Sequence, residues 1–96
     1  MYIVSLTYKA SLEAIDKELN NHIDYLKKQY AAGSFLASGR KIPRNGGVIL
    51  AKAQSREELD EILKQDPFNQ NNVADYEVIE FVPSMTSKEL SYLLEQ

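Results

Sequence analysis

The amino-acid sequence predicts an α+β domain of the ferredoxin-like class, with the element order β-α-β-β-α-β. Three observations predict it: apolar residues alternate in strand-like runs, two stretches carry helical apolar spacing, and a glycine-containing turn separates the two central strands. This class is a four-stranded antiparallel sheet with both helices on one face. We expect residues 1–96 to form one such domain, because the chain has the length of a single domain.

The first strand is expected over residues 2–8, where large apolar side chains recur at every second position. A helix should follow, capped by Ser11 and ended by Gly33. His22 is the only histidine of the chain, and it interrupts the apolar stripe of this helix, so we expect its side chain to point inward. The apolar members of the stripe are Leu12, Ile15, Leu19, Ile23, Leu26 and Tyr30.

The central hairpin is expected to join a second strand over residues 34–42 to a third over residues 48–53. Its turn is the cluster Pro43-Arg44-Asn45-Gly46-Gly47. Gly39 lies inside the second strand, and a glycine there indicates a bulge or the close approach of another group.

The second helix should open at Ser55, because Ser55-Arg56-Glu57-Glu58 forms a capping box. A polar loop is expected over residues 69–72, and the fourth strand over residues 76–82. A second capping box, Thr86-Ser87-Lys88-Glu89, predicts a short C-terminal helix.

The face of the sheet turned away from the helices is expected to be apolar, since Ile3, Ile79 and Phe81 alternate onto it. We therefore expect a homodimer in which two sheets pack together, with the terminal helix adding to the contact. The alternative is a monomer with a partly hydrated sheet.

Composition excludes several classes of function. The net charge of −3 provides no basic field for nucleic acid, and the strand over residues 48–53 lacks the aromatic side chains that RNA-binding domains of this topology use. No stretch is long enough to span a membrane, and residues 1–6 are too short an apolar run for a signal peptide, so a cytoplasmic protein is expected. With no cysteine and one histidine, we expect no metal site.

The segment Gln65-Asp66-Pro67-Phe68 carries the first candidate for chemistry. Proline disfavours the helical conformation for the preceding residue, so the second helix should end at Asp66. Asp66 follows Ile62 by four positions and Leu63 by three, which places it on the inward face. Burial and the negative end of the helix dipole would both disfavour its charge, as in a tuned acid or base. The alternative is that Asp66 only caps the turn.

We expect His22 and Asp66 to meet over the edge of the second strand. A carboxylate bound to one imidazole nitrogen fixes the tautomer and raises the basicity of the other, so the pair can act as a general base. Ser38 would donate to a substrate oxygen, and Arg40 would pair with a carboxylate or phenolate. The alternatives are a core histidine, a serine that satisfies a neighbouring backbone group and a solvated edge arginine.

Together, these residues resemble the YCII-related (YciI-like) family of the dimeric α+β barrel superfamily. The matching motifs are His22-x-x-Tyr25-Leu26, residues 33–39, the helix start at Ser55, Gln65-Asp66-Pro67-Phe68 and residues 78–81. The resemblance implies a dimer with a cavity between helices and sheet in each protomer and His22 and Asp66 as the active-site pair. It also implies chemistry without metal or organic cofactor.

The residues expected to bind substrate are Ser38, Gly39, Arg40, Pro67 and Phe68. Arg40 departs from the family pattern, in which proline often stands at this position. The expected function is a cofactor-independent small-molecule enzyme that transfers a proton in an elimination, isomerisation or hydrolysis, on an aromatic or anionic substrate. The alternative is a non-catalytic ligand-binding or regulatory module.

Overall fold

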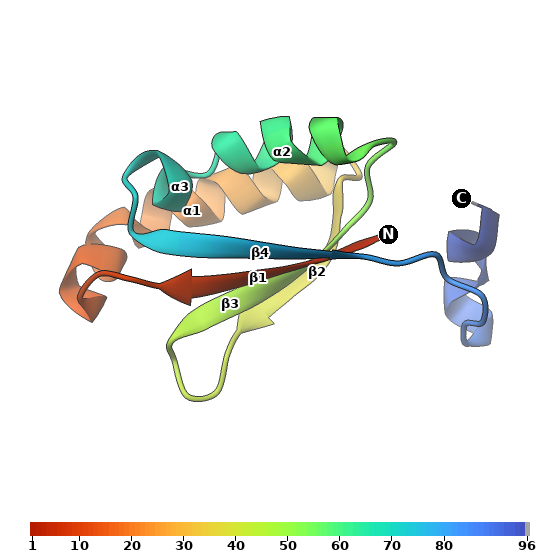
Figure 1. Ribbon diagram of the computed structural model, residues 1–96, viewed down its shortest axis with the longest axis horizontal. Helices are drawn as coiled ribbons and strands as arrows, with labels where there is room; N and C mark the ends of the chain where they lie inside the picture. The colour runs from red at the N-terminus through yellow and green to blue at the C-terminus, as the bar shows by residue number, and fades with distance from the viewer. Residues whose placement is uncertain (96) are drawn as a thin grey trace.

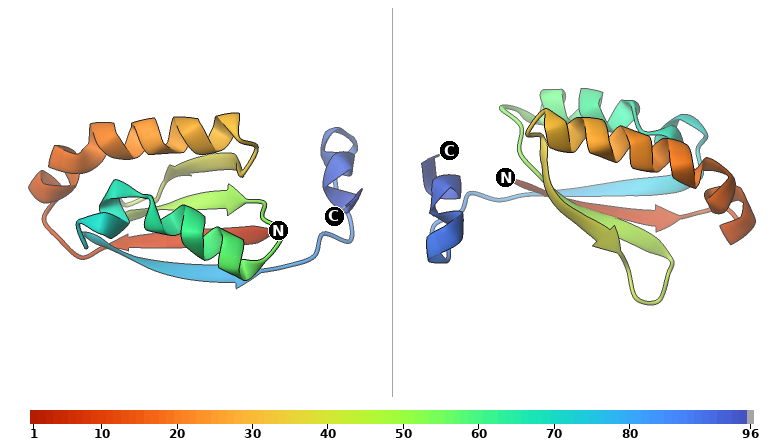
Figure 2. Two further views of the ribbon diagram at one scale, coloured as in Figure 1. Left: turned by 90° about the horizontal axis from the view of Figure 1, so that it is seen from above. Right: turned by 180° about the vertical axis from the view of Figure 1, so that it is seen from behind.

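Four strands and three α-helices are followed by a terminal 3-10 helix in the computed structural model, which describes residues 1–95 (Figure 1). The strands are all antiparallel in the order β2-β3-β1-β4. Helices α1 and α2 cover one face of the sheet and leave the other open (Figure 2). The ferredoxin-like prediction is thereby confirmed. The elements are β1 (Tyr2–Tyr8), α1 (Leu12–Ala31), β2 (Phe35–Arg40), β3 (Gly46–Ala51), α2 (Arg56–Lys64), α3 (Pro67–Gln70), β4 (Ala74–Glu80) and η1 (Lys88–Glu95).

The ends of α1 and α2 follow the predicted capping residues. The Ser11 hydroxyl accepts a hydrogen bond from the Ala14 amide, and Gly33 ends α1 with a φ of +80°, which favours glycine. At α2 the Ser55 hydroxyl accepts from the Glu58 amide as predicted, while the Glu58 carboxylate accepts from the Gln54 amide, one residue before the N-cap, at 3.0 Å.

A β-bulge at Leu36 changes which side chains of β2 share a face. Phe35 pairs with Ala51 and Ala37 pairs with Leu50, so Leu36 is the extra residue. Phe35 therefore faces the helices together with Ser38, although regular alternation along a strand would place residues three positions apart on opposite faces.

Gly46 belongs to β3 and not to the turn, so this strand starts two residues earlier than predicted. A Cβ at Gly46 would lie 1.8 Å from the Leu6 carbonyl oxygen, so the close approach of β3 to β1 requires glycine.

The C-terminal third differs most from the prediction. A one-turn helix, α3, replaces the start of the expected polar loop, and β4 lies over Ala74–Glu80 and not over residues 76–82. The terminal element is a 3-10 helix that stands away from the sheet and helices (Figure 1). Its expected capping box is not formed, because the Thr86 hydroxyl is buried without a hydrogen-bond partner among the described residues.

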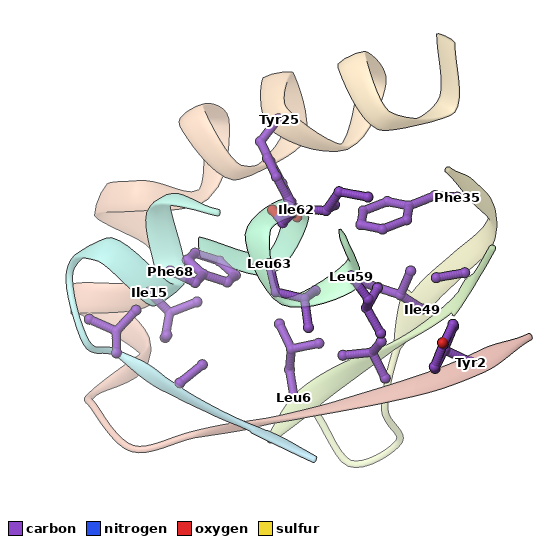
Figure 3. Packing of buried hydrophobic residues seen from close by; sticks show 14 residues of the cluster. Tyr2, Leu6, Ile15, Tyr25, Phe35, Ile49, Leu59, Ile62, Leu63 and Phe68 are labelled. Atoms are coloured by element: carbon purple, nitrogen blue, oxygen red, sulfur yellow. Dashed lines mark hydrogen bonds between the residues drawn. The ribbon is translucent and has the colours of Figure 1, made fainter. Parts of the chain in front are cut away.

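The core lies between the sheet and the helices, and α1 contributes Ile15 and Tyr25 to it (Figure 3). Tyr25 can occupy this position because its hydroxyl donates to the Ile62 carbonyl oxygen at 2.8 Å. Leu12, Ile23 and Tyr30 were expected in the buried stripe but are exposed at its margins, so α1 is rotated relative to the predicted orientation.

The open face of the sheet carries an apolar row that crosses all four strands. The strand register aligns Ala37 with Leu50, Leu50 with Ile3, and Ile3 with Ile79. The Ile79 side chain is 54% exposed. No helix among residues 1–95 is both long and apolar enough to cross a membrane.

Candidate active site

The Asp66-Pro67-Phe68 segment builds the short helix α3 immediately after α2. Gln65 closes α2, and Asp66 has an extended backbone with φ −68° and ψ 124°, as expected for a residue before proline. The Asp66 side chain accepts from the Phe68 amide at 3.0 Å, so it is the N-cap of α3. Asp66 therefore has the capping role in addition to its contacts with His22 and Tyr76.

His22 and Asp66 are adjacent, although 44 positions separate them in the chain. His22 Nδ1 lies 2.7 Å from Asp66 Oδ1. The imidazole stacks on the Phe68 ring, with centroids 4.0 Å apart and planes 8° from parallel. The Asp66 side chain is fully buried, whereas the His22 side chain keeps 12% of its surface exposed. The stack and the hydrogen bond together fix the plane and direction of the imidazole.

Asp66 accepts a third hydrogen bond from the hydroxyl of Tyr76, which lies 2.5 Å from Oδ2. The carboxylate was expected to be poorly stabilised at the end of α2, but it sits at the start of α3 with three donors around it. Sequence reasoning missed Tyr76 because it lies on β4, ten positions beyond the motif, and only its inward place in the strand alternation could have indicated it.

The hydrogen bonds define the protonation pattern of the pair. Burial, and then the charge of Asp66, raise the pKa of the Tyr76 phenol far above its ordinary value, so Tyr76 is a donor. Burial and the same carboxylate also raise the pKa of Tyr25. Because Asp66 acts as the acceptor, Nδ1 of neutral His22 carries the hydrogen, and Nε2 keeps a free lone pair.

His22 opens onto a cavity of about 180 Å³ between α1 and the β2–β3 hairpin. Five of the residues expected at the site line this cavity: His22, Ser38, Gly39, Arg40 and Phe68. The remaining walls are formed by Leu6, Tyr8, Leu19, Ile23, Leu26, Gly46, Gly47, Val48 and Ile49.

Two of the expected residues do not line the cavity. Asp66 is buried behind His22 and does not line the cavity; its carboxylate contacts the imidazole that does. Pro67 was expected to contact substrate, but it lines a separate surface hollow with Asn21 and Lys28. This placement follows from its position as the first residue of α3.

Two polar side chains of the cavity, Ser38 and Arg40, lie on β2. Ser38 Oγ lies 2.5 Å from the Tyr30 hydroxyl, a contact that sequence reasoning did not anticipate. Arg40 is exposed and forms no salt bridge within residues 1–95, so its guanidinium is available to an anion. A salt bridge connects the hairpin with α1: Arg44 Nη2 lies 2.5 Å from Asp16 Oδ1.

A larger hollow of about 640 Å³ lies at the other end of the sheet, beside Met1, Gly33 and Pro83. None of the expected site residues lines it. The smaller cavity is the candidate active site, because an oriented imidazole opens into it.

Comparison with known proteins supports the same fold. A search of curated proteins gave no match. Among solved structures, one similar chain is 5-chloro-2-hydroxyhydroquinone dehydrochlorinase from Burkholderia phenoliruptrix AC1100, in complex with 2,5-dihydroxybenzoquinone. The two structures superpose with a TM-score of 0.71 at 17% identity, over 84% of this chain and 93% of that chain. At this level of identity the similarity shows the fold alone.

The family comparison covers most of the chain. The family model of the YCII-related domain matches residues 1–82, which include both members of the histidine–aspartate pair and the whole sheet. The chain therefore belongs to the YCII-related domain family.

Proposed function

We propose that this protein is a cofactor-independent enzyme that transfers a proton to or from a small oxygenated ring compound. The observation that carries the proposal is the His22–Asp66 pair. Nδ1 is bound to a buried carboxylate, and the ring with its free Nε2 borders a cavity. Such an imidazole is a general base whose protonated form the carboxylate stabilises.

The size of the cavity supports a single-ring substrate. An apolar cavity of roughly 150 Å³ holds benzene, and the cavity beside His22 measures about 180 Å³. The rings of His22 and Phe68 and the side chains of Leu19 and Ile23 give it apolar walls. Arg40 supplies a cation for an anionic ring oxygen or carboxylate.

The chemical step that fits these groups is proton abstraction by His22 Nε2. The proton leaves a ring hydroxyl or ring carbon, and the electron pair of the broken bond forms a new double bond in the substrate. Either a leaving group then departs as an anion with its own bonding pair, or the imidazolium returns the proton to another substrate atom. The first outcome is an elimination and the second an isomerisation. In both, Asp66 stabilises the imidazolium, and Arg40 stabilises the developing negative charge on oxygen.

The similar dehydrochlorinase supplies test compounds. Chloride release from 5-chloro-2-hydroxyhydroquinone and binding of 2,5-dihydroxybenzoquinone can be measured with the wild type and with His22→Gln. We expect the variant to bind the quinone but to lose activity by about 10²- to 10⁴-fold. Binding without turnover in the wild type would support a ligand-binding module. Turnover that survives His22→Gln would contradict the proposal.

We also propose that the protein acts as a homodimer formed through the open sheet face. The row Ala37–Leu50–Ile3–Ile79 gives that face a continuous apolar surface, which proteins seldom leave to solvent. Light scattering after size-exclusion chromatography should give the mass of two chains for the wild type and the mass of a single chain for Ile79→Lys. A wild-type monomer at micromolar concentration would contradict this part of the proposal.

A further inference from the structure

Tyr76 donates a hydrogen bond to Asp66 but has no role in the proposed function. It lies on β4 opposite Leu6 of β1, and its ring packs against the core beside the helices. Its hydroxyl reaches Asp66 Oδ2 at 2.5 Å, while Oδ1 is occupied by His22 and by the Phe68 amide. Both oxygens of the carboxylate therefore have hydrogen-bond partners.

The direction of this hydrogen bond is fixed by the surroundings. Burial and the nearby carboxylate raise the pKa of the Tyr76 phenol above its ordinary value, so the hydroxyl keeps its hydrogen at neutral pH. An ionised carboxylate has no hydrogen to donate, so Asp66 Oδ2 accepts the hydrogen bond from the Tyr76 hydroxyl.

We propose that Tyr76 is a positioning residue of the active site: it orients Asp66 so that Oδ1 meets His22, and it draws negative charge away from the imidazole, keeping His22 neutral and able to accept a proton. This inference rests on the proposed function for its catalytic meaning. Its physical content, the coupling of a phenol to an imidazole through one carboxylate, can be measured without any substrate.

The coupling has a defined sign. When His22 is neutral, the carboxylate charge is fully available to Tyr76, and the hydrogen bond is at its strongest. When His22 is protonated, the imidazolium neutralises part of that charge, and the bond from Tyr76 weakens. Tyr76 therefore stabilises the neutral imidazole more than the protonated one, and its removal should make His22 easier to protonate.

The test is a titration of His22 followed by NMR, in the wild type and in Tyr76→Phe. As the chain has one histidine, its ring signals need no assignment. We expect the midpoint to rise by about half a pH unit in the variant, a fraction of the effect of a full charge-assisted hydrogen bond. The other titratable or charged groups near the imidazole, Tyr25 on α1, Tyr8 on β1 and Arg40 on β2, are the same in both proteins.

Tyr25→Phe is the matched control. It also removes one phenol hydroxyl near Asp66, but that hydroxyl donates to the Ile62 carbonyl oxygen and not to the carboxylate. Its midpoint should stay within about 0.2 pH units of the wild type. An unchanged midpoint in Tyr76→Phe, or an equal rise in Tyr25→Phe, would overturn the inference.

A second measurement keeps the inference testable if Tyr76→Phe does not fold. The Tyr76 hydroxyl hydrogen, which is hydrogen-bonded to Asp66 Oδ2, should exchange slowly enough with water to give a resolved downfield NMR signal in the wild type. A signal that moves in Asp66→Asn would support the inference, and a hydroxyl that exchanges freely would overturn it. Neither result depends on turnover, so failure here is distinct from failure of the proposed function.

Discussion

Replacement of Asp66 by alanine should destabilise the protein more than any other single loss of charge. The substitution removes the acceptor of three hydrogen bonds, from His22, Phe68 and Tyr76. Each hydrogen bond to a charged group contributes about 1.5–3 kcal/mol, which sets an upper limit of roughly 4.5–9 kcal/mol on the loss.

Two corrections reduce this limit. His22 and Tyr76 are partly exposed, so their donors can bind water once the carboxylate is gone. The substitution also removes the desolvation penalty of a charged carboxylate that is fully buried. The Phe68 amide remains buried, and the loss of the α3 cap alone costs about 1 kcal/mol. We expect the free energy of unfolding to fall by about 3 kcal/mol, a large part of the roughly 5–15 kcal/mol typical of a domain.

Urea denaturation monitored by circular dichroism measures this loss. With a slope of about 1.5 kcal/mol per molar urea, the midpoint should fall by about 2 M. Asp75→Ala is the control, because Asp75 is exposed and only bridges Lys9 on the surface. It should change the free energy of unfolding by less than about 0.5 kcal/mol. Equal, small effects of the two substitutions would refute the reasoning.

Three further predictions test other parts of the structure. Arg40→Gln should weaken binding of 2,5-dihydroxybenzoquinone about tenfold in a fluorescence titration without changing the urea midpoint, since Arg40 forms no salt bridge within residues 1–95; unchanged binding would exclude it from the site. Gly46→Ala should cost about 3 kcal/mol in urea denaturation, because its Cβ meets the Leu6 carbonyl, whereas Gly39→Ala, with no atom within 4 Å, should cost little. The pKa of Tyr76 is higher in the folded protein than the value of about 10 in the unfolded chain, so its contribution to stability is complete below pH ~10 and decreases above it. Urea midpoints should therefore fall between about pH 10 and 11, and should fall less in Tyr76→Phe; a wild-type midpoint that does not change with pH would contradict this.

Much of the site could be predicted because its signals are local. His22 interrupts an apolar helical stripe, and Asp66 precedes a proline at the end of another helix. Both patterns depend only on helical periodicity and on the steric effect of proline. The ferredoxin-like order then places the two helices side by side on one face of the sheet, so a residue in the middle of α1 can meet the residue that follows α2.

The features that could not be predicted depend on tertiary contacts. The bulge at Leu36 has no glycine or proline to mark it, and it arises from the pairing of β2 with β3. Tyr25 is buried in the core, where Ile23 was expected, because its hydroxyl donates a hydrogen bond to the Ile62 carbonyl oxygen of α2. In the sequence, Tyr76 is an ordinary residue of a strand. Its hydrogen bond to Asp66 depends on how β4 lies relative to the turn after α2, which the sequence does not indicate.

The tautomer of neutral His22 tests the central claim most directly. Long-range ¹H–¹⁵N correlation NMR above the titration midpoint distinguishes a protonated Nδ1 from a protonated Nε2, and the single histidine makes the spectrum unambiguous. We predict that Nδ1 carries the hydrogen in the wild type and that this preference is lost in Asp66→Ala. A hydrogen on Nε2 in the wild type would contradict the assignment of His22 as a base oriented by Asp66.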